Sequence, residues 1–169
     1  AAGGLEFVEQ PCRTLAEVSA LRGRIDIPVA VDQSIRDASD PLRLPLAASA
    51  DIAVLTVAAL GGVRRALRIA EACGLPCVVS GALESSIGTA GGLALAGVLP
   101  DTGFASTLGV GLLGGDIVSG GRTLMPVDGT LPVSPMPPAP DLARLATFAA
   151  GAETVARWRH RLASAQHLI

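Results

Sequence analysis

Short hydrophobic runs alternate with amphipathic segments over the first two-thirds of the chain. The short runs are rich in β-branched residues and are apolar along their length, as expected for strands of a sheet that is covered on both faces. Val63, Ala66, Leu67 and Ala70 recur at the spacing of one helix face. The pattern predicts strands over residues 5–9, 29–32, 52–57, 77–80 and 104–108, and helices over residues 15–22, 41–48, 63–72 and 87–98.

The predicted strands end at a nearly constant interval. Successive ends at Glu9, Asp32, Thr56 and Ser80 are 23, 24 and 24 residues apart. A strand–helix–strand repeat of this length is typical of parallel strands joined by right-handed crossovers. The spacing therefore predicts an α/β structure built from consecutive βα units.

Two α/β architectures accommodate such units. A closed (β/α) barrel has eight of them in about 250 residues, so this chain of 169 residues would form a portion of one. An open doubly wound sheet could be completed by five strands, but the Gly-rich phosphate turn that usually follows its first strand is replaced by Glu9-Gln10-Pro11-Cys12. The opening Ala1-Ala2-Gly3-Gly4 is typical of a helix end that leads into a strand. We expect the C-terminal portion, about five βα units, of a TIM-like barrel.

The pattern changes after residue 124. Six prolines between residues 126 and 140 break regular structure, and Asp128-Gly129 is typical of a turn. Asp141 is expected to cap a helix, and a further helix is predicted over residues 153–164. We therefore expect two regions: a partial barrel over residues 1–124, and an irregular Pro-rich segment with C-terminal helices that packs on it over residues 125–169.

Composition excludes several classes of protein. Half of the residues are hydrophobic and 17% are charged, which favours a folded core. The net charge of −2 provides no basic face for nucleic acid. The most apolar stretches, residues 52–63 and 87–99, are shorter than the ~20 residues that cross a bilayer. No secretion signal opens the chain. We expect a cytoplasmic protein with a small-molecule partner and with no nucleic acid or membrane partner.

Cysteine and histidine do not occur at the spacing of a metal site. The three cysteines lack framework spacing, as expected for reduced thiols in a cytoplasm, and the two histidines lie far away in the tail. A zinc site needs about four such ligands and is not expected. The residues concerned are Cys12, Cys73, Cys77, His160 and His167.

Two carboxylates stand at the ends of consecutive predicted strands, Glu9 and Asp32. Barrel active sites form at the C-terminal strand ends, and neighbouring strands lie about 4.8 Å apart, so both side chains could reach one cation. Oxygen ligands suit Mg²⁺. The alternative is that these acids cap helices or face solvent, and strand spacing by itself leaves both interpretations open.

Four segments resemble the enolase superfamily in order and spacing. They are Glu9-Gln10-Pro11 and residues 28–36, 51–62 and 78–88, within a resemblance that covers roughly residues 5–99. The greatest similarity is to o-succinylbenzoate synthases of the actinobacterial type. This resemblance implies a barrel with an N-terminal capping domain. It places the first three strands, with a Lys-x-Lys pair and the first metal-binding Asp, upstream of Ala1, in an N-terminal half of the same enzyme.

The resemblance also implies a reaction and a site. Synthases of this type dehydrate a cyclohexadiene carboxylate to o-succinylbenzoate in menaquinone biosynthesis: a Lys removes the proton α to the carboxylate, and Mg²⁺ stabilises the developing charge. Glu9 and Asp32 correspond to the second and third metal ligands. The loop after the seventh strand is implied to contact the substrate's carboxylates, although a simple helix N-cap by Ser85 or Ser86 is the alternative. The loop residues are Ser80, Gly81, Leu83, Ser85 and Ser86.

Two positions depart from the family pattern. Thr56 stands where the family places a Lys on the sixth strand, and all 13 basic residues of this chain are Arg. A Thr hydroxyl cannot supply an ammonium group, so the cationic partner is missing. Gln33 replaces the Glu beside the metal-binding Asp. We hypothesise that this anion and this cation were lost together as a pair, because an unpartnered buried charge is destabilising.

Three functions stay open. The first is a synthase-type lyase whose other half lies upstream. The second is a racemase or epimerase of N-acyl amino acids or dipeptides, which needs a base on each face of its substrate, so Thr56 counts more heavily against it. The third is a degenerate homologue without catalysis. For residues 1–169 alone we expect little or no synthase activity.

Overall fold

The fold is known from a computed structural model, which describes residues 4–108, 117–118, 124–133 and 139–167. Within these ranges the chain forms a parallel four-stranded sheet, with the order β1-β2-β3-β4. A doubly wound sheet reverses its strand order at a switch point, whereas sequential order is that of a barrel. The strands are β1 (Val8–Glu9), β2 (Val29–Val31), β3 (Ile52–Thr56) and β4 (Cys77–Ser80).

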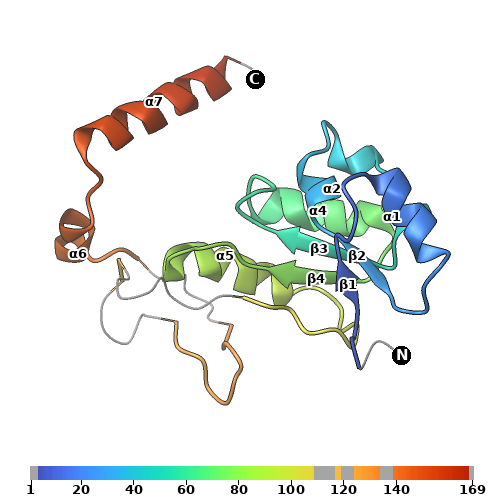
Figure 1. The fold of residues 1–169 in the computed structure, drawn as a ribbon. Coiled ribbons are helices and arrows are strands. Elements are labelled where there is room, and N and C mark those ends of the chain that lie inside the picture. Colours follow the sequence, from blue (N-terminus) through green and yellow to red (C-terminus); the bar gives the residue numbers. More distant parts are fainter. Residues whose placement is uncertain (1–3, 109–116, 119–123, 134–138, 168–169) are drawn as a thin grey trace.

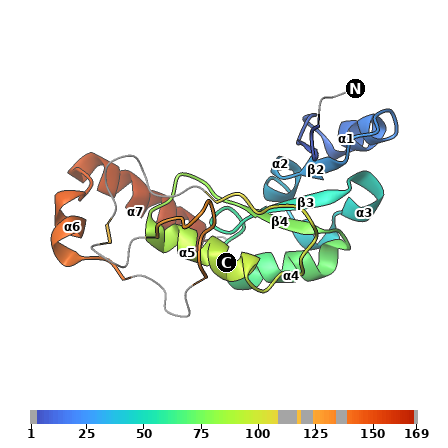
Figure 2. The same ribbon diagram turned by 90° about the horizontal axis from the view of Figure 1, so that it is seen from below.

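Helices connect the strands as the spacing predicts. Figures 1 and 2 show α4 and α5 beside β3 and β4, and α1 and α2 beside β2. The helices are α1 (Leu15–Arg22), α2 (Gln33–Arg36), the 3₁₀ helix η1 (Pro41–Arg43), α3 (Leu46–Ser49), α4 (Val63–Cys73) and α5 (Ser86–Ala96).

Local chemistry sets the ends of the regular helices. Thr14 and Glu17 form a capping box at the start of α1, in which each side chain accepts a hydrogen bond from the other residue's backbone N–H. Helix α4 ends at Gly74, whose φ of 67° is the left-handed conformation that glycine adopts without strain. The predictions for these two helices are confirmed.

The helix predicted over residues 41–48 is wrong in one respect. It is divided into η1 and α3, and Leu44 between them is extended, with φ −69° and ψ 135°. The cause is Pro45, because the ring of a proline disfavours the helical conformation of the residue before it. Helix α2 is a further short element that the hydrophobic pattern does not predict.

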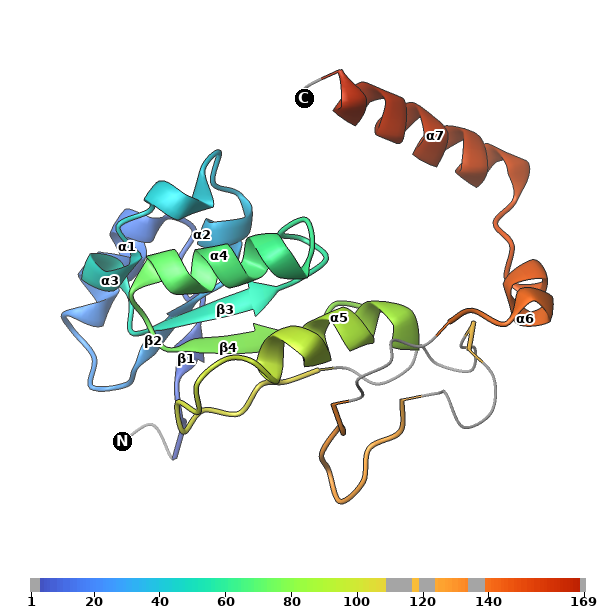
Figure 3. The same ribbon diagram turned by 180° about the vertical axis from the view of Figure 1, so that it is seen from behind.

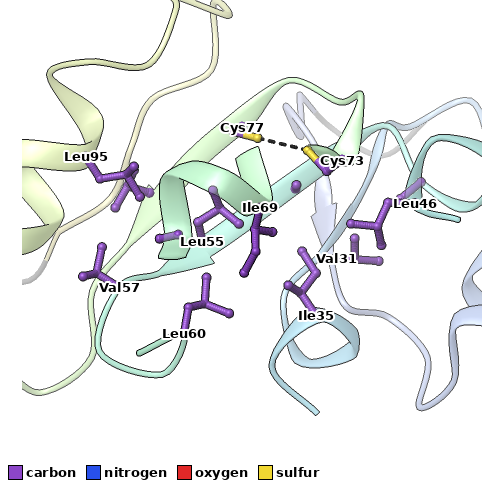
Figure 4. Close-up of a cluster of buried hydrophobic side chains, with 14 of the residues drawn as sticks. Val31, Ile35, Leu46, Leu55, Val57, Leu60, Ile69, Cys73, Cys77 and Leu95 are labelled. Atoms are coloured by element: carbon purple, nitrogen blue, oxygen red, sulfur yellow. Dashed lines mark hydrogen bonds between the residues drawn. The ribbon is translucent and has the colours of Figure 1, made fainter. Parts of the chain in front are cut away.

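The two faces of the sheet bury different side chains. The helix-covered face carries the larger hydrophobic cluster, in which strand residues such as Val31 and Leu55 pack with Ile35 and Ile69 of the helices (Figure 4). The opposite face buries Ala30, Ile52, Val54 and Val78, with Phe7 and Phe104 packed against them. We call this opposite face the inner face. The rings of Phe7 and Phe104 meet there edge to face, with centroids 5.8 Å apart. A residue just before β1 thus contacts a residue that follows β4 in the chain.

The fifth predicted strand, over residues 104–108, forms a single parallel bridge between Thr107 and Ser80. Thr107 N–H donates to the Val79 carbonyl at 2.9 Å, and Gly81 N–H donates to the Thr107 carbonyl at 3.1 Å. The segment therefore lies next to β4 and continues the sequential order. Regular pairing is limited to this one position among the described residues.

The tail contains the turn and the helix cap that the sequence predicts. Asp128 and Gly129, with φ of 48° and 78°, form the turn of a bridge between Val127 and Thr130. Asp141 accepts hydrogen bonds from two backbone N–H groups at the start of α6 (Leu142–Thr147). Neither α6 nor α7 (Ala152–Gln166) has a buried residue, and Figure 3 shows α7 apart from the sheet. The division at residue 124 and the packing of the tail on the barrel stay predictions.

No helix in the described part of the chain has both the length and the apolar character needed to cross a membrane.

Candidate functional site

Four polar side chains lie at the C-terminal ends of the four strands, and we call this row, Glu9, Asp32, Thr56 and Ser80, the carboxyl edge. Side chains alternate between the two faces of a strand. Asp32 follows Ala30 by two positions, Thr56 follows Val54, and Ser80 follows Val78, so the edge belongs to the inner face and not to the helix-covered one. The structure therefore brings the predicted strand-end residues to one face of one edge.

Asp32 is the most enclosed acid of this edge, with its side chain 13% exposed. Its Oδ2 lies 2.8 Å from Nη2 of Arg36, whereas its buried Oδ1 has no hydrogen-bond partner among the described residues. Burial raises the pKa of Asp32, the charge of Arg36 opposes the rise, the charge of Asp37 adds to it, and the nearby Thr56 hydroxyl lowers the pKa. A buried oxygen without a partner is rare and leaves a lone pair available to a cation.

Glu9 lies close enough to Asp32 for the two charges to repel. Burial raises the pKa of Glu9, the negative charge of Asp32 raises it further, and the positive charge of Arg36 opposes both. A carboxylate whose pKa is raised by a neighbouring carboxylate is stabilised by a cation close to both. The described residues contain no group of three or more His, Cys, Asp or Glu side chains placed to hold a metal. One or two carboxylates, completed by water and substrate oxygens, are what Mg²⁺ commonly takes, so this pair fits Mg²⁺.

Thr56 is the last residue of β3 and is 5% exposed. It pairs in register with Ser80 and lies near the Asp32 carboxylate. A side chain with an ammonium group at this position would therefore meet Asp32.

Gln33 is exposed and turns away from the inner face. Its Nε2 donates to both carboxylate oxygens of Asp37 at 2.8 Å, and its Oε1 accepts from Arg36. Helix α2 begins at Gln33, so the Gln33 side chain leaves the backbone in a different direction from that of Asp32. Among the described residues, no hydrogen bond joins Gln33 to Thr56. The hypothesis of a lost pair between these two positions is not supported by a contact, and it stays a hypothesis.

The residues of the loop after β4 differ in their exposure and in their contacts. Gly81 is held to Thr107 by its backbone, and Leu83 is 87% exposed. Ser85 occupies the N-cap position of α5 but makes no side-chain cap hydrogen bond, and the buried Ser86 accepts at Oγ from Leu124 N–H at 3.1 Å. Ser85 is thus the N-cap residue that the alternative interpretation expected, although its side chain makes no cap hydrogen bond. The substrate contacts of this loop stay a prediction.

Gln10 and Arg36 are two residues beside the carboxyl edge that sequence reasoning missed. Arg36 pairs with Asp32, and Gln10 accepts hydrogen bonds from the backbone N–H groups of Asp32 and Ser34. The Glu9-Gln10-Pro11 motif does not by itself reveal these contacts, which become visible once β1 and β2 are paired.

Two cysteines lie near the N-terminal end of β4, at the other end of the sheet from the carboxyl edge. Sγ of Cys73, at the end of α4, lies 3.4 Å from Sγ of Cys77, the first residue of β4 (Figure 4). The hydrogen bond from Cys77 lowers the pKa of Cys73 to about 6, while the same bond and burial raise the pKa of Cys77. Both residues belong to the helix-covered core, away from the carboxyl edge.

Comparisons with known proteins give the same fold. The o-succinylbenzoate synthase of Mycolicibacterium smegmatis is 50% identical over 167 residues, covering 99% of this chain and 51% of that protein. The o-succinylbenzoate synthase of Thermobifida fusca is 52% identical over 130 residues, covering 76% of this chain and 40% of that protein. The solved muconate cycloisomerase of Pseudomonas fluorescens superposes with a TM-score of 0.70 at 30% identity, covering 86% of this chain and 42% of that one.

The chain spans about half the length of the curated relatives it matches. The family model described as "Enolase C-terminal domain-like" matches residues 1–140. With the sequential parallel sheet and the carboxylates at its edge, this match shows that the chain belongs to the enolase C-terminal domain-like family.

Proposed function

We propose that this chain forms part of an o-succinylbenzoate synthase-type lyase, which dehydrates a small cyclohexadiene carboxylate with the help of Mg²⁺. The observation that carries the proposal is the pair Glu9 and Asp32 on neighbouring strand ends, with a buried Asp32 oxygen that has no partner among the described residues. A relative named as an o-succinylbenzoate synthase, 50% identical over 99% of this chain, supports the reaction class.

Glu9 and Asp32 are the groups that would hold the cation. When bound, Mg²⁺ supplies positive charge that stabilises the negative charge on a substrate carboxylate as the neighbouring C–H loses its proton. Burial raises the pKa of both carboxyl groups, and the Asp32 charge raises that of Glu9 further, so a cation beside them would stabilise their charged forms.

This chain brings no strong base to the reaction. Lys is absent, Thr56 cannot accept a proton near neutral pH, and the two His lie in the tail. We therefore assign proton removal to the part of the enzyme that the chain does not span, in line with the upstream Lys-x-Lys pair that the family resemblance implies. The residues of this chain would hold the cation and, through Ser80, Gly81, Leu83, Ser85 and Ser86, line the substrate's approach.

Two further predictions belong to this proposal. An epimerase would need a base on each face of its substrate, and Thr56 occupies one of those positions, so dehydration is favoured. A cytoplasmic location agrees with three free cysteines among the described residues, including two buried thiols 3.4 Å apart that are not joined.

The test is a chimera. The part of the Mycolicibacterium smegmatis synthase that this chain does not match is fused upstream of residues 1–169, and o-succinylbenzoate formation is measured by mass spectrometry. We expect activity that depends on Mg²⁺, a loss of about 100-fold or more in Asp32→Asn, and a gain of about 10-fold or more in Thr56→Lys. Residues 1–169 alone should form little or no product.

The controls separate the proposal from a degenerate homologue. Asp26→Asn, on an exposed loop, should leave the rate unchanged. A folded chimera that is inactive both with Thr56 in place and as the Thr56→Lys variant, or whose rate is the same with Asp32→Asn, would exclude synthase chemistry. Adding Gln33→Glu to Thr56→Lys tests the lost-pair hypothesis: equal unfolding free energies with and without it would end that hypothesis.

A further inference from the structure

Gln10 has a backbone conformation that its sequence context disfavours. Its φ is 40°, on the positive side that residues with a Cβ rarely adopt. It also precedes Pro11, whose ring favours an extended residue before it. Such strain persists where surrounding contacts determine the conformation, and it gathers at functional sites. Gln10 is therefore held in this shape by its hydrogen bonds.

Those hydrogen bonds use the whole side-chain amide. Oε1 accepts from the N–H groups of Asp32 and Ser34, each at 3.1 Å, and Nε2 donates to Ser34 Oγ and to the Cys12 carbonyl, each at 2.9 Å. The Gln10 backbone N–H donates to the Ala30 carbonyl at 2.8 Å. An amide offers two donors and two acceptor lone pairs, so all four are engaged between the end of β1 and the turn after β2.

The consequence for Asp32 follows from its place at the N-cap of α2. An Asp at this position ordinarily accepts a hydrogen bond from the second or third helical N–H. Ser34 is the second helical residue here, and its N–H is taken by Gln10, while Asp32 makes no side-chain cap hydrogen bond. Gln10 thus replaces Asp32 as the capping acceptor, and Asp32 Oδ1 keeps no partner among the described residues.

We propose that Gln10 is the positioning residue of the candidate cation site: by capping α2 in place of Asp32, it leaves the Asp32 carboxylate available for a cation at the strand end next to that of Glu9. This rests on the proposed function in so far as the ligand is a divalent cation. Gln10 itself touches neither cation nor substrate. Its neighbour Glu9 and its partner Asp32 are fixed relative to each other because one side chain bridges the two strand ends.

The hydrogen-bond exchange can be tested without metal, on residues 1–169. In the wild type, a long-range HNCO spectrum should couple the Ser34 amide to the side-chain carbonyl carbon of Gln10. In Gln10→Ala the same amide should couple to the carboxyl carbon of Asp32, which takes over the cap. If the Ser34 amide couples to neither in Gln10→Ala and the variant is folded, the inference is overturned.

Cation binding is the second readout, with Mn²⁺ as the probe and paramagnetic broadening of the Glu9 and Asp32 amide signals as the measurement. Gln10→Ala should weaken Mn²⁺ binding about 10-fold or more, whereas Gln10→Glu, which keeps the length and the accepting oxygens, should remain within a few-fold of wild type. Ser34→Ala, the matched control, removes the hydroxyl and leaves the N–H that Gln10 caps, so it should change binding little. Unchanged binding in Gln10→Ala overturns the proposal.

The cation assignment and the capping role of Gln10 can be contradicted separately. If wild type binds no Mn²⁺ but the exchange from Gln10 to Asp32 is seen, the cation assignment of the proposed function is contradicted and the capping role is supported. Should Gln10→Ala fail to fold, the folded Gln10→Glu variant still decides: an Asp32 carbon coupled to the Ser34 amide there would overturn the inference, because the accepting oxygens are retained.

Discussion

Two aspartates at opposite ends of the sheet each pair with an arginine at 2.8 Å, yet their acidities shift in opposite directions. Asp51 precedes β3, at the edge we call the amino edge, and accepts from Arg22 and from Val29 N–H. Burial tends to raise its pKa, but the hydrogen bonds from Val29 and Arg22 and the charge of Arg22 together lower it. At the carboxyl edge burial prevails, and the pKa of Asp32 is raised.

The difference lies in hydrogen bonding more than in charge. Both oxygens of Asp51 have donors, and the side chain is 31% exposed, whereas Asp32 is 13% exposed and one of its oxygens has no partner among the described residues. An ion pair at the same distance therefore stabilises the fold in one place and leaves an incompletely satisfied charge in the other. Barrel folds separate stability at the amino edge from chemistry at the carboxyl edge, and the contrast between Asp51 and Asp32 has the direction that this rule predicts.

The largest effect is expected from Asp51→Ala. The change removes hydrogen bonds that tie α1 and β2 to the start of β3, and charge-assisted bonds of this kind contribute about 1–3 kcal/mol. The free energy of unfolding in urea should fall by that amount. Asp26→Ala, at an exposed position of the same edge, should change it by less than about 0.5 kcal/mol. Equal losses in both variants would remove the basis of the comparison.

Asp32→Asn should change the free energy of unfolding in the opposite direction from Asp51→Ala. Asn keeps the shape of the side chain and removes a charge whose burial outweighs its pairing with Arg36. We expect the unfolding free energy at pH 7 to rise by about 1 kcal/mol or less, while cation binding is lost. A fall in stability would mean that the Arg36 ion pair contributes more than burial removes, and the two edges would then be alike.

The pH dependence sharpens this contrast. A carboxyl whose pKa is raised by folding stabilises the fold fully below its ordinary value, 3.8 for Asp32, and loses that contribution as the pH rises through the folded pKa. Asp51, with a lowered pKa, contributes above 3.8 and loses its contribution as the pH falls through the folded pKa. The unfolding free energies of wild type, Asp32→Asn and Asp51→Asn are measured in urea from pH 7 to pH 3. The stability gained in Asp32→Asn and the stability lost in Asp51→Asn should both become smaller as the pH falls.

Much of the fold and part of the edge were accessible from sequence. Hydrophobic spacing predicts β3, β4, α1 and α4 closely, because each buries a continuous apolar face. It fails where backbone chemistry overrides the pattern, as at Pro45, which divides the helix predicted over residues 41–48. Strand-end position was enough to predict that Glu9 and Asp32 lie at one edge, because parallel strands end at a common edge; their role as metal ligands stays a prediction.

The connections within the edge could not be predicted in the same way. The role of Gln10 depends on a positive φ and on hydrogen bonds to residues 22 and 24 positions later in the chain, neither of which a hydrophobic pattern records. Gln33 was expected to be coupled to position 56, but the first turn of α2 points it outward to Asp37. Direction at a helix start is set by caps and turns, which need the pairing of β1 with β2 to be known.

The smallest effect, and the most specific, is expected from Glu9→Gln. Glu9 is more exposed than Asp32, so neutralising it should stabilise the fold less, although the sign should be the same because its pKa is also raised. Part of that rise comes from the Asp32 charge. In the Asp32→Asn background the gain from Glu9→Gln should therefore be smaller than in wild type, and a double-mutant cycle of unfolding free energies measures the difference. Strict additivity would show that the two carboxylates do not interact electrostatically. A cation shared between them would then have no electrostatic support.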